Sequence, residues 1–252
     1  MNVKEQCDEI IDRCVAECAN LSGVKKLTSG TIDKDYYIRH VIETILRIRL
    51  ARTADGEAIS QLARTNPVAA SLWCRYADEE MLHDRMFLSD VKAMGVDADY
   101  VYSHDPLVAT KMLQGYLYYT LKHEGPLGLL AKAYFLEAFT YRTQKFWNKH
   151  IGEQFGPASV RGANAHLTLD GDLDHSGDVW KVVERLLVDE GDEIRVVGHV
   201  QTFVRLMEMY FVDLENAVST DKPTNLAAVA PMQVVAKQAD AEYDGFELET
   251  VH

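Results

Sequence analysis

Apolar residues recur every three or four positions along most of the chain, which is the period of an α-helix with one buried face. In the stretch 34–53, for example, Ile38, Val41 and Ile45 fall on one side of a helix. The sequence offers no convincing run of alternating apolar and polar residues of the kind that marks a half-buried strand. The pattern therefore predicts an all-α chain of about eight or nine helices.

Capping residues predict where several of these helices begin. Asp33 is a candidate N-cap, and Asn66-Pro67 and Asp105-Pro106 each place an N-cap before a proline at the first helical position. Asp55-Gly56 is expected to end one helix, and Glu190-Gly191-Asp192 to separate the last two. The helices then cover about 3–20, 34–53, 57–64, 67–94, 106–122, 126–150, a stretch that starts within 158–163 and carries His166, 178–189 and 194–216.

Length and composition favour a single helical domain over residues 1–252, in which residues from about 220 to 252 form a loosely packed C-terminal tail. The formal net charge is −13, and such an acidic surface argues against nucleic acid or an anionic membrane as a partner. No apolar run reaches the roughly 18 residues of a membrane span, and the polar N-terminus does not resemble a signal peptide. We expect a cytoplasmic protein that acts on a small molecule.

The four cysteines do not suggest a disulfide framework. Cys7, Cys14 and Cys18 share one predicted helix face, and Cys74 stands alone in another helix. This spacing is typical of small core residues, and no Cys-x-x-Cys pair offers a thiolate site for a metal.

Two ionisable residues interrupt the apolar face of the predicted helix 67–94. Glu80 lies seven residues from both Trp73 and Phe87, which is nearly the same bearing on a helix, and His83 falls inside the same stripe. A carboxylate and an imidazole three residues apart on a buried face need partners, because an unpaired buried charge costs several kcal/mol. A positively charged group is therefore expected to contact Glu80.

Glu137 is a similar interruption on the predicted helix 126–150. It occupies a position in the stripe where an apolar residue is expected. A lone buried Glu is usually explained by an ion pair, for which Lys132, Arg142 and Lys145 of the same helix are candidates, and for Glu137 this interpretation stands equally beside metal binding.

The densest cluster of candidate ligands lies in residues 166–180. His166 and Asp170 are four residues apart and share a helix face, whereas His175 follows His166 by nine residues and would lie opposite in an unbroken helix. His175 therefore belongs to the same site only if the helix breaks or bulges at Asp170-Gly171-Asp172.

Together these positions supply carboxylates and imidazoles from the inward faces of three helices. Such ligand sets build dinuclear iron or manganese sites in helical bundles, whereas structural zinc prefers thiolates. The competing interpretation is a polar core network beside a solvated acidic loop. The candidate metal ligands are Glu80, His83, Glu137, His166, Asp170 and His175, with Asp172, Asp174 and Glu43 as weaker candidates.

These spacings resemble the haem-oxygenase-like family of non-haem dinuclear iron oxidases and oxygenases, which is related by fold to thiaminase-type and pyrroloquinoline-quinone-synthase-type bundles. In that family one helix supplies a Glu and a His, a later helix a Glu, and a further helix a His-x-x-x-Asp-x-x-His signature. Glu80 with His83, Glu137, and His166 with Asp170 match these elements in order. The final His of the signature would fall at Leu173, so His175 is two residues late. The resemblance covers roughly residues 35–215.

The resemblance implies a haem-oxygenase-like bundle that binds two ferrous ions (Fe2+) and uses O2 as co-substrate. The reactions of the family include N-oxygenation, desaturation and oxidative C–C cleavage to alkenes or nitriles, on amino acids or fatty acids in specialised metabolism. An amino acid or a derivative is the expected substrate here, and a fatty acid the alternative. Family members are often homodimers, and the apolar helix 107–121 could supply such an interface.

Three residues are candidates for binding the substrate: Arg142 for a carboxylate, and Tyr134 and Tyr141 for an aromatic or aliphatic group. Arg39, Glu43 and Arg47 are read as a structural ladder at i, i+4 spacing, in which Glu43 approaches a metal only if its helix turns inward.

Three other functional classes stay open, one of which is a helical binding protein that carries out no reaction, in which buried Glu80, His83, Glu137 and His166 would be unusual. A metal-free thiaminase-type enzyme would need a nucleophile, for which Cys74 is the thiol to test. A non-catalytic metal-binding or ferritin-like protein would normally carry two Glu-x-x-His pairs, and only Glu80-x-x-His83 is found.

Overall fold

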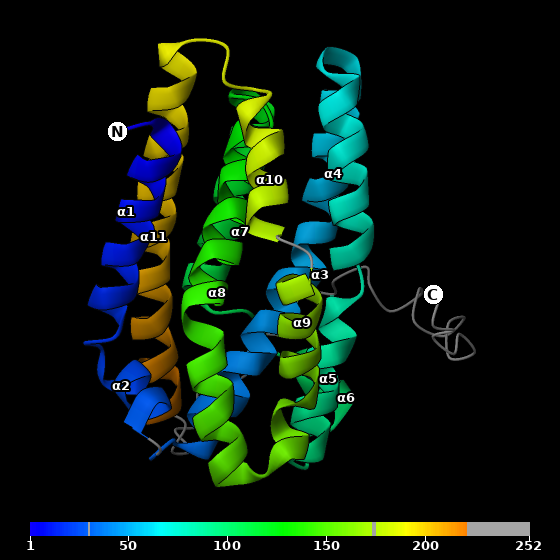
Figure 1. Cartoon of the computed structure of the whole chain (residues 1–252). Helices are drawn as coiled ribbons and strands as arrows, with labels where there is room; N and C mark the ends of the chain where they lie inside the picture. The colour runs from blue at the N-terminus through cyan, green and yellow to red at the C-terminus, as the bar shows by residue number, and fades with distance from the viewer. Residues whose placement is uncertain (30, 173–174, 221–252) are drawn as a thin grey trace. The chain divides into compact units, whose positions relative to one another are not determined.

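The computed structural model describes residues 1–29, 31–172 and 175–220 of the chain, and all of these belong to one compact unit. The described residues form helices and no strand, which confirms the all-α prediction (Figure 1). The helices are α1 (Val3–Cys18), α2 (Ser22–Ser29), α3 (Lys34–Thr65), α4 (Pro67–Glu80), α5 (His83–Ala93), α6 (Ala98–Ser103), α7 (Val108–His123), α8 (Leu127–Phe155), the 3-10 helix η1 (Pro157–Val160), α9 (Arg161–Asp172), α10 (His175–Glu184) and α11 (Glu190–Thr220). The predicted tail lies outside the described residues beyond position 220.

Three long helices, α3, α8 and α11, together pack against most of the other elements of this bundle. α3 packs against α4, α5, α7 and α11, while α8 contacts α1, α2, α7, α9, α10 and α11. In Figure 1, α1 and α11 run side by side along one edge and α4 and α5 follow one another along the opposite edge. Four of the candidate ligands, Glu80, His83, Glu137 and His166, lie around the space between α3, α4, α5, α8 and α9.

Several predicted helix starts are confirmed by their capping bonds. The carboxylate of Asp33 accepts the N–H groups of Asp35 and Tyr36 at the start of α3, and the amide oxygen of Asn66 accepts the N–H of Ala69 at the start of α4. These bonds satisfy backbone donors that have no partner within their own helix.

The predicted start at Asp105-Pro106 is wrong, because α7 begins at Val108. Asp105 uses its carboxylate for an ion pair with Lys111. The N–H groups at the start of α7 are instead satisfied by side chains of two other helices: the N–H of Leu107 by Glu43 of α3, and that of Ala109 by Asp213 of α11.

Two predicted boundaries inside the bundle also differ from the structure. Asp55-Gly56 does not end a helix, since α3 continues to Thr65 and the helix formers after Gly56 extend it. The predicted single helix 67–94 is broken at Met81 and Leu82 into α4 and α5. That break lies between two of the candidate ligands.

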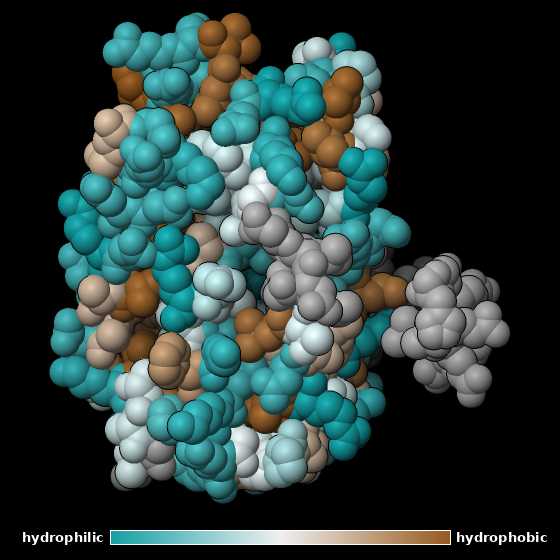
Figure 2. Space-filling view, in the orientation of Figure 1, coloured by the Kyte–Doolittle hydropathy of each residue, from teal (hydrophilic) through white to brown (hydrophobic). Residues whose placement is uncertain are grey.

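The core is formed by the apolar stripes that the sequence predicts. Cys7, Cys14 and Cys18 are buried and free, as small core residues would be, while Cys74 is exposed. The face of the molecule seen in Figure 2 is mostly hydrophilic, with apolar side chains in small separate groups. None of the described helices combines the length and the apolar character needed to cross a membrane.

Candidate metal centre

Glu80, His83 and His166 meet in the interior of the bundle, although they come from three different helices. The Oε2 atom of Glu80 lies 3.0 Å from Nδ1 of His83 and 4.0 Å from Nε2 of His166. The two imidazole rings have centroids 4.7 Å apart and meet edge to face. One ligand atom from each residue lies within 4.8 Å of the others, which is the spacing that a shared metal ion requires.

The break between α4 and α5 places Glu80 at the end of one helix and His83 at the start of the next. The carbonyl of Met81 accepts a hydrogen bond of 2.8 Å from Nε of Arg52 on α3. Asp84, which follows His83, is buried and forms ion pairs with Arg49 and Arg52. Arg49 and Arg52 of α3 therefore stabilise the break between α4 and α5, and with it the inward orientation of His83.

His166 is positioned by an unusually close approach of α9 to α5. Asp90 of α5 is fully buried, and its carboxylate accepts the N–H groups of Gly162 and Ala163 at 2.6 and 2.8 Å. Burial raises the pKa of Asp90, and these two hydrogen bonds oppose the shift. A Cβ atom at Gly162 would collide with the backbone carbonyl of Met86, so only glycine permits this approach.

Glu137 faces the same interior space from α8. Its Oε1 atom accepts a 2.7 Å hydrogen bond from the hydroxyl of Tyr76 on α4. Burial and the charge of Glu137 raise the pKa of Tyr76 well above its usual value, so this hydroxyl keeps its proton. Sequence periodicity places Tyr76 near the apolar face of its helix, but it does not show which hydroxyl contacts which carboxylate.

A cavity of about 140 Å³ adjoins the cluster. Glu80, Glu137 and His166 line one part of it, and apolar side chains of α7, α8 and α11 line much of the rest. The volume is close to that of a cavity of roughly 150 Å³ that accommodates benzene, so a small organic molecule fits. The arrangement thus joins a set of metal-binding groups to a space for a substrate.

Two further ionisable residues lie near the cluster and were not predicted to belong to it. Lys132 of α8 lines the cavity. Asp55 of α3 is close enough to Lys132 and Glu80 for both charges to act on it; burial raises the pKa of Asp55, Lys132 lowers it and Glu80 raises it. The sequence analysis did not place Asp55 near the site, because an Asp-Gly pair is typical of a helix end.

The remaining candidate ligands of the 166–180 cluster cannot be placed. The described part of α9 ends at Asp172, and that of α10 begins at His175. The side chains of Asp170, Asp172 and His175, and the whole of Asp174, lie outside the described residues. Their assignment as ligands stays a prediction.

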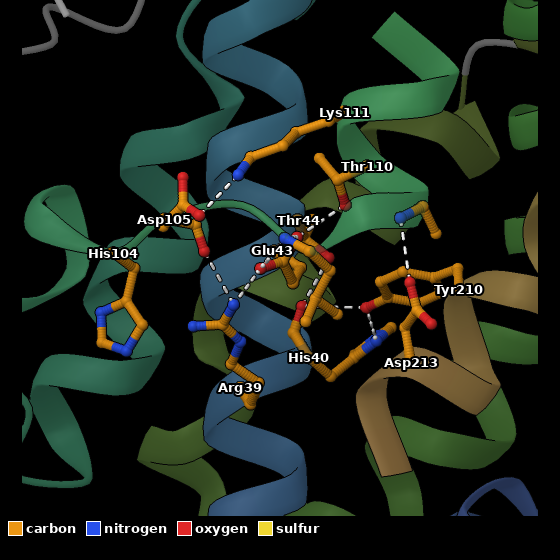
Figure 3. A network of polar contacts seen from close by, with 12 residues as sticks. Arg39, His40, Glu43, Thr44, His104, Asp105, Thr110, Lys111, Tyr210 and Asp213 are labelled. Carbon is orange, nitrogen blue, oxygen red and sulfur yellow. Dashed lines mark hydrogen bonds and ion pairs between the residues drawn. The ribbon is translucent and has the colours of Figure 1, made fainter. Parts of the chain in front are cut away.

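Glu43 lies in a separate polar network on α3 (Figure 3). It is completely buried and forms a 2.7 Å ion pair with Arg39. Its oxygens also accept the N–H of Leu107 at 3.2 Å and the hydroxyl of Thr110 at 2.6 Å. The i, i+4 ladder is therefore formed only by Arg39 and Glu43, whereas Arg47 bonds to Thr44.

The three predicted substrate-binding residues lie away from this cavity. Arg142 pairs with Asp8 and Asp12 of α1, and the hydroxyl of Tyr134 donates to Asp8. Tyr141 is 75% exposed. These residues attach α1 to α8 or face solvent, and none of them lines the space beside Glu80.

Comparisons with known proteins bear on the fold. No protein-family model matches the chain, and no curated protein matches it. Among solved structures, a domain of unknown function with a heme oxygenase-like fold from Shewanella denitrificans superposes with a TM-score of 0.78 at 21% identity, over 90% of this chain and 99% of that chain.

Two TenA homologues superpose as well. The one from Pseudomonas syringae has a TM-score of 0.69 at 10% identity, over 86% of this chain and 96% of its own. The one from Pyrococcus furiosus has a TM-score of 0.65 at 10% identity, over 84% of this chain and 100% of its own. At these identities the likeness establishes the architecture alone, and the chain has the heme oxygenase-like fold that its sequence predicts.

Proposed function

We propose that the chain is a non-haem dinuclear iron enzyme that uses O2 to oxidise a small metabolite. The observation that carries the proposal is the convergence of Glu80, His83 and His166 within 4.8 Å, beside a cavity that Glu137 also lines. Imidazole and carboxylate donors from facing helices suit ferrous ions, and iron bound there would supply the activation of dioxygen.

The donor set fits a metal ion better than it fits a purely structural role. His83 and His166 are buried and Glu80 is half-buried, and the Glu80 carboxylate lies 3.0 Å from His83 and 4.0 Å from His166. A metal ion would balance the carboxylate charge and bind neutral imidazoles. Iron is preferred to manganese because of the family resemblance, and a second ion would draw on Glu137 and on the candidates of residues 170–175.

The protein's own groups would orient the site and shield it. The Tyr76 hydroxyl fixes one oxygen of Glu137, and its raised pKa keeps it a donor at neutral pH. The ring of Phe87 packs 5.4 Å from that of His166 and covers one side of the cluster. The substrate would be an amino acid or derivative, with N-oxygenation, desaturation or oxidative C–C cleavage as the outcome, or a fatty acid in the alternative.

The TenA homologues share the fold, and they keep a metal-free thiaminase-type function as the second candidate. That function needs a nucleophile in the cavity. Cys74 is exposed, and no cysteine is among the described residues that line the cavity. The metal-dependent function is therefore the better supported of the two.

The proposal is tested by anaerobic titration of the metal-free full chain with ferrous ion, followed by metal analysis and by oxygen consumption with a panel of amino and fatty acids. About two irons per chain and substrate-dependent oxygen uptake are expected. Absence of iron binding, or bound iron with no oxygen reaction, would refute the enzyme proposed here.

Ligand variants sharpen this test. His83→Ala and Glu137→Ala should lose most of the iron while helical circular dichroism is retained. His123→Ala and Glu153→Ala are matched controls, because both residues are exposed, Glu153 lies on the same helix as Glu137, and neither lines the cavity. Full iron content in either ligand variant would show that the assignment is wrong.

A further inference from the structure

Arg47 is a half-buried arginine of α3 that lines the same cavity as Glu80 and His166. Its Nη2 atom donates a 3.0 Å hydrogen bond to the hydroxyl of Thr44, and its guanidinium carbon lies 4.8 Å from the ring centroid of Tyr210. In the part of the chain that the structure describes, no carboxylate lies within 4.0 Å of this guanidinium. Most of its five N–H donors are therefore available to a ligand.

Other arginines of the same helix differ from Arg47 in this respect. Arg39 is paired with Glu43, and Arg49 and Arg52 are both paired with Asp84. Arg64 is exposed to solvent and donates a hydrogen bond to the hydroxyl of Ser60. Arg47 is the arginine of α3 that turns toward the cavity, and a guanidinium in such a place is suited to hold a carboxylate with two parallel hydrogen bonds.

Arg47 supplies the positive charge in this part of the cavity, because the ionisable group beside it is neutral. Nδ1 of His40 lies 2.7 Å from the hydroxyl of Tyr210. Burial, with a further contribution from the charge of Arg47, lowers the pKa of His40 to about 3, so the imidazole is neutral at pH 7. Lys132 lines the same cavity, but its charge acts on Asp55, which lies near Glu80.

The walls beyond Arg47 are mainly apolar, with Thr140, Thr143 and Gln144 as neutral polar groups. The side chains that line this region include Leu113, Phe139, Trp147, Met207 and Phe211. They offer no charged partner to the remainder of a ligand. A cation at one point of a small apolar cavity fits a molecule with one anionic group and a hydrophobic body.

The position of Arg47 also suits a ligand that reaches the metal-binding cluster. Arg47 precedes Arg49 by two residues, a rise of about 3 Å along the helix. Arg49 binds Asp84, the residue next to His83, so α3 carries Arg47 at nearly the level of the cluster. The cavity is continuous between the two, since Arg47, Glu80 and His166 all line it.

We propose that Arg47 binds the carboxylate of a small monocarboxylate whose apolar body extends along the cavity toward Glu80 and His166. As a statement about the substrate, this inference rests on the proposed function. As a statement about a binding site, it needs no metal and can be tested without one.

The test is to measure binding of hexanoate, norleucine and hexan-1-ol to the full chain by ligand-observed NMR, in metal-free and iron-loaded protein. Hexanoate and hexan-1-ol differ in the charged group, and norleucine adds an α-ammonium group to hexanoate. Wild-type protein should bind at least one carboxylate more tightly than the alcohol. A preference for norleucine would indicate an amino-acid ligand, and one for hexanoate a fatty-acid ligand.

Variants of Arg47 identify the anchor. Arg47→Met should weaken binding of the preferred carboxylate about 10- to 100-fold, because hydrogen bonds to a charged group are lost. Arg47→Lys should recover only part of it, since lysine keeps the charge and loses the planar fork. Arg64→Met, an exposed arginine of the same helix, should bind like wild type.

Two results would overturn the inference: wild-type protein that binds neither carboxylate more tightly than hexan-1-ol, or Arg47→Met that folds and retains wild-type affinity. Circular dichroism and thermal unfolding establish that the variants fold. Because the measurement is made in metal-free protein, its failure is separate from failure of iron binding, which the ferrous titration reports independently.

Discussion

Glu43 and Glu80 are both glutamates on apolar helix faces of the same bundle, yet their surroundings differ. Glu43 is met by the Arg39 guanidinium, a backbone N–H and the hydroxyl of Thr110 (Figure 3), which are donors that keep their protons at neutral pH. Glu80 is met by two imidazoles. Imidazole can exchange a proton for a metal ion, whereas a guanidinium cannot. The donors around a buried carboxylate thus indicate its role more reliably than its burial does.

The largest effect that tests this comparison is on stability. Glu43→Ala should lower the free energy of unfolding by about 3–5 kcal/mol, because it leaves the half-buried Arg39 without its partner and the start of α7 without an acceptor. Glu80→Gln should change the free energy by less than about 1 kcal/mol in metal-free protein and should lose iron. Urea denaturation measures the stability of both variants, and metal analysis measures their iron content. A large loss of stability in Glu80→Gln together with a loss of iron in Glu43→Ala would contradict the comparison.

A second way to break the comparison is to separate the helices that carry the imidazoles. Gly162→Ala should cost about 3 kcal/mol, because the new methyl group would collide with the Met86 carbonyl and push α9 away from α5. Iron affinity should fall with it. Gly198→Ala is the control, since a Cβ there meets nothing within 4 Å; it should stabilise α11 by roughly 0.5–1 kcal/mol. Equal thermal stabilities of the two variants would contradict the close approach.

The third test concerns His40, a histidine of the Glu43 region that is held neutral, and its effect is the smallest when expressed per pH unit. In the unfolded chain His40 gains a proton near pH 6.5, whereas in the folded chain it does so near its pKa of about 3. The unfolded state therefore binds more protons in this window, and the stability present above pH 6.5 is lost as pH falls toward 3, by about 1.4 kcal/mol per pH unit.

Urea denaturation between pH 6.5 and 4.5 measures this slope. His40→Gln should show a shallower loss than wild type, and His123→Gln, at an exposed position, should match wild type. Identical slopes for all three proteins would mean that folding does not lower the pKa of His40.

Much of the fold followed from local signals. Asp33 and Asn66 cap the helices that they were predicted to cap, since each cap and the N–H groups that donate to it lie within three residues. The break at Met81 and the start of α7 were missed for the opposite reason. Their carbonyl and N–H groups are satisfied by Arg52 and Glu43 of another helix, and no local pattern encodes a partner so distant in sequence.

The candidate site divides in the same way. The helical period was enough to predict that Glu80, His83, Glu137 and His166 face the interior. The structure brings these four residues around one space. The helical period could not predict what Tyr134 and Arg142 would meet, because their partner Asp8 belongs to α1, whose position was unknown. For Arg47 the sequence allowed an i, i+4 partner in Glu43, and that carboxylate is instead held by Arg39.

The cap that Asp90 provides for α9 has a consequence for how the interior can be observed. The amide hydrogens of Gly162 and Ala163 are bonded to a buried carboxylate 72 and 73 residues earlier in the chain. They can exchange with solvent only when α5 and α9 come apart, whereas most helical amides exchange when their own helix frays. The deuterium uptake of these two amides would therefore time the opening between His83 and His166, even in protein that carries no metal.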